Sequence, residues 1–465
     1  MADRITLGST LSGLLIDGLD HTPWIAATMT VTDRGVQVTV PHLHGDDQFQ
    51  EVTRWLDRDD GDTNLLLESI DLRISLFGLR LSSRRTDMAR NIAEGQLLAD
   101  NAVMRPRDGD LADPLLVEEV RSEIDGLTDW SRLHSLRSEV VSLGEGPDIR
   151  DVSAYVLEQV DGLEWTQGEA QLRITTTWEV QHGSLTQIED RATLISSFPA
   201  PRSIADHIQE QRKFANLLAV VFGTRISFRR HEVRDSRFPA RSLSGRVSHL
   251  PYVDLISSTT FRESQTERPS RKVLIRPLFY MGHLQPTQLQ DWAANYDGIG
   301  RALHPYLEVL RTPSAALENR AINAAMSLEA LGNRLERVEG EECTYRNSRR
   351  RTMATWVLRC ILNANHAFTP EAFNSSVLFA RAIAKNYNTI KHPGNEFPDS
   401  LHTYILCELS VSIVRHNIVK MALGEAVFTN VDGDEPYRQA NMMLQNYGLV
   451  IEDDGKISVR SQSDE

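Results

Sequence analysis

Four polar residues in the C-terminal third of the chain follow a spacing that a helix would place on one face. Arg381, Lys385, Asn388 and His392 are separated by four, three and four residues, and such steps align along one side of an α-helix. Imidazole accepts or donates a proton near neutral pH, and a nearby cation can hold a phosphate. The pattern predicts either acid–base chemistry at a phosphate or a solvated helix face that happens to end in His.

The helix that carries these residues is expected between two signals. Thr369-Pro370 is typical of a helix start, because Thr is a good N-cap and Pro suits the first turn. At the other end, Pro393 disfavours helical geometry at His392. We therefore expect His392 to be exposed at the end of the helix. The opposite face holds residues suited to a core, namely Phe373, Val377, Ala380, Ala384 and Tyr387.

The segment from Lys385 to His392 resembles the motif of HEPN ribonucleases, in which an Arg precedes a His by four to six residues. Asn386 fits the polar position after the Arg, but Lys385 stands where the family has Arg. The β-rich first half, which opens near Gly13, and the helical segment Leu-Glu-Ala-Leu at 328–331 narrow the resemblance to the ApeA-like HEPN proteins.

The resemblance implies a bacterial anti-phage protein that acts by abortive infection and is a metal-independent endoribonuclease without a cofactor. Its implied substrate is host or phage RNA, with tRNA among the candidates. RNA carries its own nucleophile, the 2′-OH, so cleavage needs a base, an acid and positive charge at the phosphoryl group. His392 would transfer protons, and Lys385 or Arg381 would hold the phosphate. A homodimer through the helical bundle would pair two motifs, because a single His per chain would otherwise serve both proton transfers.

Glu329 is the carboxylate that we expect to face these residues. It lies three residues past Met326, at the edge of an apolar stripe, where a carboxylate is partly desolvated and needs a cationic partner. That partner is either a helix-edge salt bridge or, across the bundle, Arg381, Lys385 or His392. The resemblance favours the second alternative, because a Glu stands at the matching place in ApeA-like proteins.

Local basic patches are the candidates for binding RNA, because the chain as a whole is acidic. Its formal net charge is −14, and a field of that sign repels phosphate. The arginine run near 350 is either a solvated helix start or a phosphate-binding patch, and a second cluster contains Arg271, Lys272 and Arg276. The predicted RNA-binding residues are Arg346, Arg349, Arg350, Arg351 and Lys391.

The hydrophobic period changes near residue 285 from two to 3.6, which predicts an α+β protein. Residues 1–285 are expected to form a β-rich region of two packed sub-domains. That region includes a helix at 204–222 ending at Gly223, and strands at 224–228 and 272–275. Residues 286–430 are expected to form an antiparallel HEPN-like bundle, and residues 431–465 a short helix, a hairpin turning at 453–455 and a tail. The bundle helices are predicted at 288–310, 313–338, 348–364, 370–390 and 398–423.

The composition, 41% hydrophobic and 25% charged, is that of an ordinary globular protein. No apolar run reaches the roughly 18 residues of a membrane helix, and the N-terminus lacks the pattern of a signal peptide. Three well-separated cysteines suit a reducing compartment and argue against a disulfide framework and a zinc site. We therefore expect a cytoplasmic protein with no metal site and no membrane partner.

The first 285 residues show no recognisable chemistry, so we expect them to sense a phage-derived trigger and to restrain the nuclease. Two other functions stay open. One is a degenerate HEPN domain that binds RNA or a partner protein without cutting, which the Lys at 385 would suit. The other is a helical interaction protein in which His392 only ends a helix.

Overall fold

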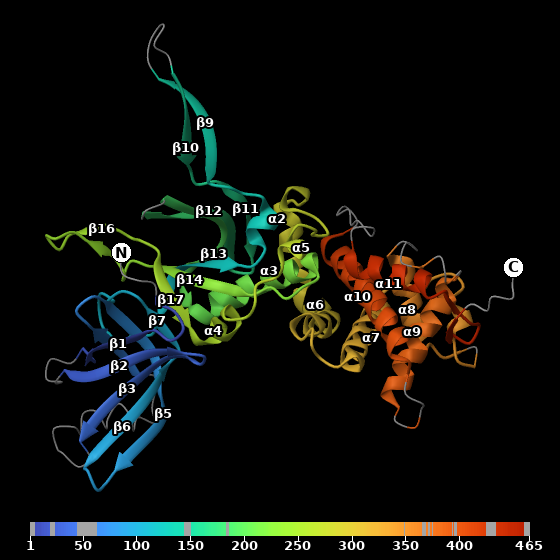
Figure 1. Cartoon of the computed structure of the whole chain (residues 1–465), viewed down its shortest axis with the longest axis horizontal. Coiled ribbons are helices and arrows are strands. Elements are labelled where there is room, and N and C mark those ends of the chain that lie inside the picture. The colour runs from blue at the N-terminus through green and yellow to red at the C-terminus, as the bar shows by residue number, and fades with distance from the viewer. Residues whose placement is uncertain are drawn as a thin grey trace. The chain divides into compact units, whose positions relative to one another are not determined.

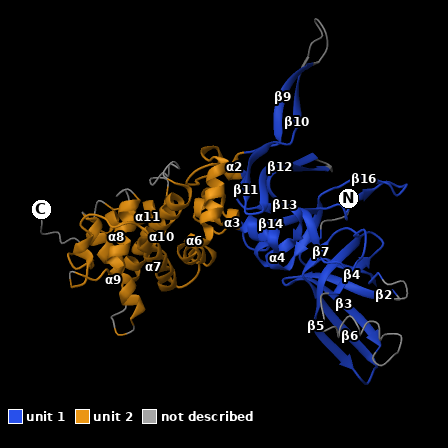
Figure 2. Ribbon diagram, turned by 180° about the vertical axis from the view of Figure 1, so that it is seen from behind, with its two compact units in different colours: residues 1–128, 133–212, 227–268 blue, residues 129–132, 213–226, 269–465 orange. Residues whose placement is uncertain are grey.

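The computed structural model divides the chain into two compact units (Figure 1, Figure 2). Unit 1 comprises residues 1–128, 133–212 and 227–268, and unit 2 comprises residues 129–132, 213–226 and 269–465. Strands dominate unit 1 and helices dominate unit 2, so the predicted α+β class is confirmed. The structure describes residues 5–18, 24–43, 63–143, 150–182, 186–347, 349–364, 369–370, 373, 375–392, 394, 398–424 and 434–459.

Unit 1 is built on a 13-stranded sheet whose order is β11-β12-β13-β8-β14-β17-β7-β5-β4-β1-β2-β3-β6. Its first seven strands in the chain are β1 (Thr10–Ile16), β2 (Ile25–Thr32), β3 (Gly35–Leu43), β4 (Thr63–Glu68), β5 (Arg73–Asp87), β6 (Ile92–Ala99) and β7 (Asn101–Val103). The later strands are β8 (Leu116–Ile124), β11 (Asp161–Gln167), β12 (Ala170–His182), β13 (Thr186–Ser203), β14 (Phe228–Arg234) and β17 (Val253–Ser257).

An additional pairing of β5 with β6 closes the first six strands into a ring. Apolar residues alternate along these strands, and the side chains that point inward are fully buried. Because the ring is closed, none of these six strands has a free edge within it, as in a β-barrel. The core of this ring includes Leu15, Met29, Val38, Leu65 and Leu97.

The rest of unit 1 packs against the first part of α3 (Ile204–Phe222). Gln211 of this helix donates through Nε2 to the Val120 carbonyl of β8 at 2.9 Å. The helix ends as predicted at Gly223, whose φ of +64° only glycine adopts easily. The remaining short elements are α2 (Leu127–Ser131), β9 (Leu136–Leu143), β10 (Arg150–Leu157), β15 (Ala240–Arg241), β16 (Val247–His249) and α4 (Ser258–Ser264).

Unit 2 is a helical bundle around α10, which is buried along nearly its whole length. Helices that are apolar on all sides belong in the centre of a bundle, and α10 packs against α6, α7 and α11. The main helices of unit 2 are α6 (Pro286–Arg311), α7 (Leu317–Arg334), α8 (Met353–Asn363), α9 (Ser376–Lys391), α10 (Ser400–Leu423) and α11 (Glu435–Asn446). Shorter elements are α5 (Arg271–Leu274), η3 (Met281–His283), η4 (Glu341–Thr344), β18 (Leu449–Ile451) and β19 (Ile457–Val459).

Residues 213–226 belong to unit 2 although they precede the predicted bundle. Trp292 of α6 donates through Nε1 to the Lys213 carbonyl at 2.8 Å, and Arg415 of α10 donates through Nε to the Val220 carbonyl at 2.7 Å. The end of α3 is therefore part of the same packed unit as α6 and α10.

Several predicted element boundaries are wrong. The strand predicted at 272–275 is the short helix α5, the strand predicted at 224–228 begins only at Phe228, and α8 begins at Met353 rather than at the arginine run. The motif helix begins at Ser376 instead of after Thr369, because Ser375 caps it by accepting from the N–H groups of Val377 and Leu378. In the described parts of the chain, no helix is both long and apolar enough to span a membrane.

Candidate functional site

The motif helix α9 presents His392 to solvent, as predicted. His392 follows the last helical residue, and its N–H donates to the Asn388 carbonyl at 3.2 Å. The opposite side of α9 is buried through Phe379, Ala380 and Ile383. This buried side fixes the orientation of the helix, so the imidazole stands at an open helix end where a ligand can reach it.

Lys385 lies on the same helix, two turns before His392. Seven residues at 1.5 Å each separate the two positions by roughly 10 Å along the axis. The Lys385 Nζ lies 2.6 Å from an Asp454 carboxylate oxygen, and both side chains are substantially exposed. This contact, followed by the Lys456 N–H, holds the pKa of Asp454 below its usual range. Lys385 is thus reachable from solvent but already neutralised by a carboxylate of the same chain.

Arg381, one turn before Lys385, is held by two backbone carbonyls. Its guanidinium donates to the Cys343 carbonyl at 2.7 Å and to the Asp453 carbonyl at 3.1 Å. The side chain therefore links α9 to η4 and to the turn between β18 and β19. In this position Arg381 orients these three segments.

Asn386 and Lys391 do not lie in one row with Lys385 and His392. The Asn386 Oδ1 accepts from Thr403 Oγ1 at 2.9 Å, so its amide links α9 to α10. The Lys391 Nζ donates to the Tyr387 hydroxyl at 3.2 Å and lies 5.2 Å from the centre of that ring. This hydrogen bond is the main reason why the pKa of Lys391 is raised.

Glu329 is exposed on α7, so the expected partial desolvation is wrong. Its charge contributes to the raised pKa of Lys391, after the larger effect of Tyr387. Within the described residues, no hydrogen bond or ion pair joins Glu329 to Arg381, Lys385 or His392. Glu329 lies instead on the wall of a pocket of about 790 Å³ between α6 and α7.

The arginine run forms a tight exposed turn before α8. The Arg346 N–H donates to the Arg350 carbonyl at 2.8 Å, and the Arg350 N–H donates back at 3.0 Å. Arg349 is exposed as well, and the Arg351 guanidinium lies 5.6 Å from the centre of the Trp356 ring. Because Arg346 follows Cys343 by three residues, its Cα lies within about 11 Å of the residue that holds Arg381. The turn therefore begins close to α9, and its residues Arg346, Arg349 and Arg350 are exposed.

Sequence reasoning missed the buried ion pair that supports this turn. Arg359 of α8 donates to both carboxylate oxygens of Glu341 in η4, at 2.6 and 2.8 Å. The Tyr345 hydroxyl donates to the same carboxylate. These contacts, Arg359 first, lower the pKa of Glu341 to about 2 despite complete burial. The sequence did contain a signal for this ion pair: Arg359 stands inside the apolar run of α8, and a buried charge requires a partner.

A second buried ionic cluster joins α10 to Asp434, the N-cap residue of α11, and was also missed. Asp434 accepts from His416 Nε2 at 3.2 Å and lies 3.3 Å from Arg415. Burial lowers the pKa of His416, so it is neutral near pH 7. Burial alone would raise the pKa of Asp434, but the Arg415 charge, followed by the His416 hydrogen bond, brings it below its usual value.

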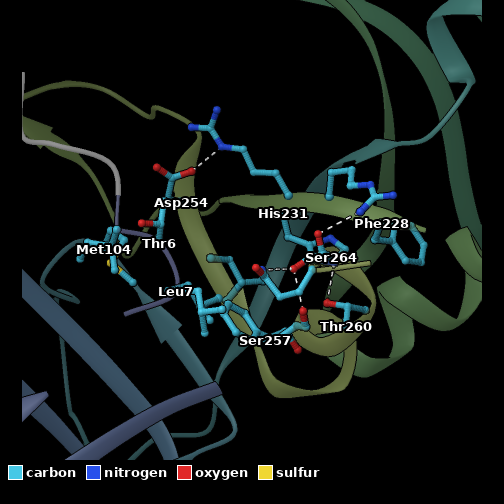
Figure 3. A pocket seen from close by; sticks show the side chains of 16 residues that line it. Thr6, Leu7, Met104, Phe228, His231, Asp254, Ser257, Thr260 and Ser264 are labelled. Carbon is cyan, nitrogen blue, oxygen red and sulfur yellow. Dashed lines mark hydrogen bonds and ion pairs between the residues drawn. The ribbon is translucent and has the colours of Figure 1, made fainter. Parts of the chain in front are cut away.

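Unit 1 contains its own pocket of about 200 Å³, which His231 of β14 lines together with Thr260 and Ser264 (Figure 3). Burial, with a smaller effect of Arg212, lowers the pKa of His231 to about 3. Its ring is therefore neutral at pH 7, and both nitrogens have partners. Nδ1 lies 2.7 Å from Ser122 Oγ, and Nε2 lies 2.9 Å from Thr260 Oγ1.

The His231 contacts continue as a chain of hydrogen bonds to a second buried histidine. Ser122 donates to Gln211 Oε1, Gln211 donates to Ser196 Oγ at 2.8 Å, and Ser196 lies 2.9 Å from His207 Nδ1. His207 completes the chain by donating through Nε2 to a β8 carbonyl at 3.1 Å. Every member is satisfied, which is typical of a network that fixes a polar core. We assign it to the packing of α3 on the sheet.

Residues 65–288 match the family model described as ApeA N-terminal domain 1. This stretch of the chain is similar to the N-terminal domain of ApeA-like proteins. The match spans just under half of the chain and ends in the first turn of α6, so it covers none of the site residues in unit 2 described above. No curated protein and no solved structure was found to match the chain.

Proposed function

We propose that this ApeA-like chain is a metal-independent endoribonuclease of the HEPN type that acts in anti-phage defence by abortive infection. The observation that carries the proposal is the exposed His392 at the end of α9, two turns beyond the exposed Lys385. A turn of exposed arginines begins within about 11 Å of the backbone that holds Arg381. Imidazole next to positive charge is what cleavage by the RNA 2′-OH requires.

In the proposed reaction, His392 removes the proton from the 2′-OH as the oxygen attacks the adjacent phosphorus. The bond to the 5′-oxygen breaks, and that oxygen takes a proton from the His392 of a second copy. The products are a 2′,3′-cyclic phosphate and a free 5′-OH. A homodimer through the bundle supplies the second imidazole, and Lys385 balances the charge on the phosphoryl oxygens. Asn386, through Thr403, holds α9 on α10.

A second candidate function is RNA or protein binding without cleavage. This candidate is favoured by the ion pair between Lys385 and Asp454, because the ammonium group that a nuclease would use to bind phosphate already binds a carboxylate. Lys also provides only a point charge at a position where Arg would bind phosphate with two hydrogen bonds. RNA cleavage separates this candidate from the first.

The experiment is incubation of the purified chain with total RNA in EDTA, followed by identification of ends that carry 2′,3′-cyclic phosphate. His392→Ala should lower the cleavage rate by about 10²-fold or more, since acid–base groups contribute factors of that size. His304→Ala is the matched control, because His304 is also exposed on a helix of unit 2. If His392→Ala cleaves at the wild-type rate, the proposed site is wrong.

We further propose that unit 1 responds to a phage-derived trigger and restrains the nuclease. Expressing the chain from residue 286 onward is a poor test, because it removes residues 213–226 from unit 2. RNA cleavage by the full chain, with and without extract of phage-infected cells, tests the idea directly. Equal rates under both conditions would contradict it.

A further inference from the structure

The turn between β18 and β19 lies directly on the motif helix. The two strands pair from Leu449 opposite Val459 to Ile451 opposite Ile457, and residues 453–455 form the turn. The Gly455 N–H donates to the Glu452 carbonyl at 2.8 Å, and its φ of +83° is one that glycine adopts without strain. The acidic turn predicted at 453–455 is therefore confirmed.

Gly455 allows an unusually close approach to α9. A Cβ at this position would lie 2.9 Å from the Arg381 carbonyl carbon and 3.0 Å from the Arg381 Cβ. Such contacts are too short for a side chain. The hairpin itself is held by three buried apolar residues, Leu449, Ile451 and Ile457. Its docking thus rests on shape and apolar burial.

The polar contacts of this turn face two of the cations of the motif helix, Arg381 and Lys385. Asp454 places its carboxylate 2.6 Å from the Lys385 Nζ, and the Asp453 carbonyl accepts from Arg381. The Lys385 and Asp454 side chains are 43% and 61% exposed, and exposed ion pairs contribute little to folding stability. A carboxylate presents to a lysine the same charge sign and the same acceptor atoms as a phosphate.

We propose that the turn of Asp453, Asp454 and Gly455 occupies the phosphate-binding position of the motif helix and must leave it before RNA can be held there. The proposal rests on the proposed function, since it takes RNA as the ligand of Lys385. In the resting chain, Asp454 neutralises Lys385 and the Asp453 carbonyl holds Arg381. RNA then competes with a tethered carboxylate, so the chain is self-inhibited through unit 2 alone.

The exchange changes only non-covalent contacts. Phosphate oxygens replace the Asp454 carboxylate on Lys385, and Asp454 keeps its hydrogen bond from the Lys456 N–H at 2.8 Å. Among the described residues, no hydrogen bond or ion pair joins the arginine turn at 346–351 to Asp454. The contribution of the arginine turn to RNA binding should therefore be the same whether Asp454 contacts Lys385 or RNA has displaced it.

Asp454→Asn tests the proposal, because it removes the charge while keeping the size of the side chain. Asp453→Asn is the matched control: it removes an equal charge one residue away, where only the backbone carbonyl contacts α9. The probe is a 2′-O-methyl oligoribonucleotide, which cannot be cleaved, with binding followed by fluorescence anisotropy at low salt. Asp454→Asn should bind about two- to fivefold more tightly than Asp453→Asn, the range of an exposed ion pair.

Adding Lys385→Ala to Asp454→Asn should abolish this gain, because the released cation is then missing. Equal affinities of Asp454→Asn and Asp453→Asn would overturn the proposal, and so would a gain that survives Lys385→Ala. Cleavage of unmodified RNA is measured in parallel. If the affinity gain appears while no variant cleaves RNA, the self-inhibition stands and the ribonuclease proposal fails. If RNA is cleaved and the two variants bind the oligonucleotide with equal affinity, the ribonuclease proposal stands and the self-inhibition fails.

Discussion

Removal of the Glu341 charge should destabilise unit 2 and disorder the arginine turn. Glu341 is fully buried in η4, and its carboxylate receives two hydrogen bonds from Arg359. In Glu341→Gln the Arg359 guanidinium stays buried, with the Leu335 carbonyl at 2.8 Å as its remaining close acceptor. A buried charge that loses its partner typically costs about 3–5 kcal/mol.

The pKa of Glu341 gives a second, independent value for the contribution of its charge to folding stability. It is about 2 in the folded chain, against an ordinary value of 4.5, chiefly because of Arg359. At roughly 1.4 kcal/mol per pKa unit, this difference corresponds to about 3 kcal/mol at neutral pH. Because the folded pKa lies below the unfolded one, this stability is fully present above pH 4.5. It is lost as the pH falls from 4.5 towards 2.

Urea unfolding followed by far-UV circular dichroism measures the effect, with wild type and Glu341→Gln compared at pH 7 and pH 3. The difference between them should be about 3 kcal/mol at pH 7 and smaller at pH 3. Glu342→Gln is the control, because Glu342 is exposed and pairs with the exposed Arg337, so its loss should cost under about 1 kcal/mol. Equal effects of the two substitutions, or a Glu341→Gln effect that does not change with pH, would refute the reasoning.

Two further predictions concern the motif helix and the end of α3. Lys385→Arg should keep or raise the initial rate of RNA cleavage, because a guanidinium can bind phosphate through two hydrogen bonds; a rate well below wild type would show that Lys385 does not act as the family's Arg does. Gly223→Ala should destabilise unit 2 by about 1–3 kcal/mol in thermal melts. Its φ is +64°, and an added Cβ would lie 3.1 Å from the Arg415 guanidinium; an unchanged melting temperature would contradict the requirement for glycine.

Local signals in the chain determined much of the fold and part of the candidate site. The change of hydrophobic period separated strands from helices, and Gly223 ended α3 where predicted. The run of acidic residues and glycine at 453–455 became a hairpin turn. The exposure of His392 followed from its place before Pro393. Each of these features depends on residues that are neighbours in the chain, so the sequence alone carries it.

Helix starts and loop conformations were harder to predict from the sequence, because several residues compete for the same role. Thr369 and Ser375 are both good caps, and the helix begins after Ser375, where two N–H groups reach the side-chain oxygen. The arginine run was predicted as part of a helix. It forms a turn instead, closed by two backbone hydrogen bonds between Arg346 and Arg350.

Only the tertiary structure decided which groups meet. Arg381 takes its acceptors from Cys343 and Asp453, which lie 38 and 72 residues away in the chain. Lys385 meets Asp454 rather than Glu329, and Arg359 meets Glu341. The sequence specifies the charge of each group and the face of its helix. The choice of partner depends on how distant segments pack, because burial sets the cost of leaving a charge unpaired and packing brings one particular partner within reach.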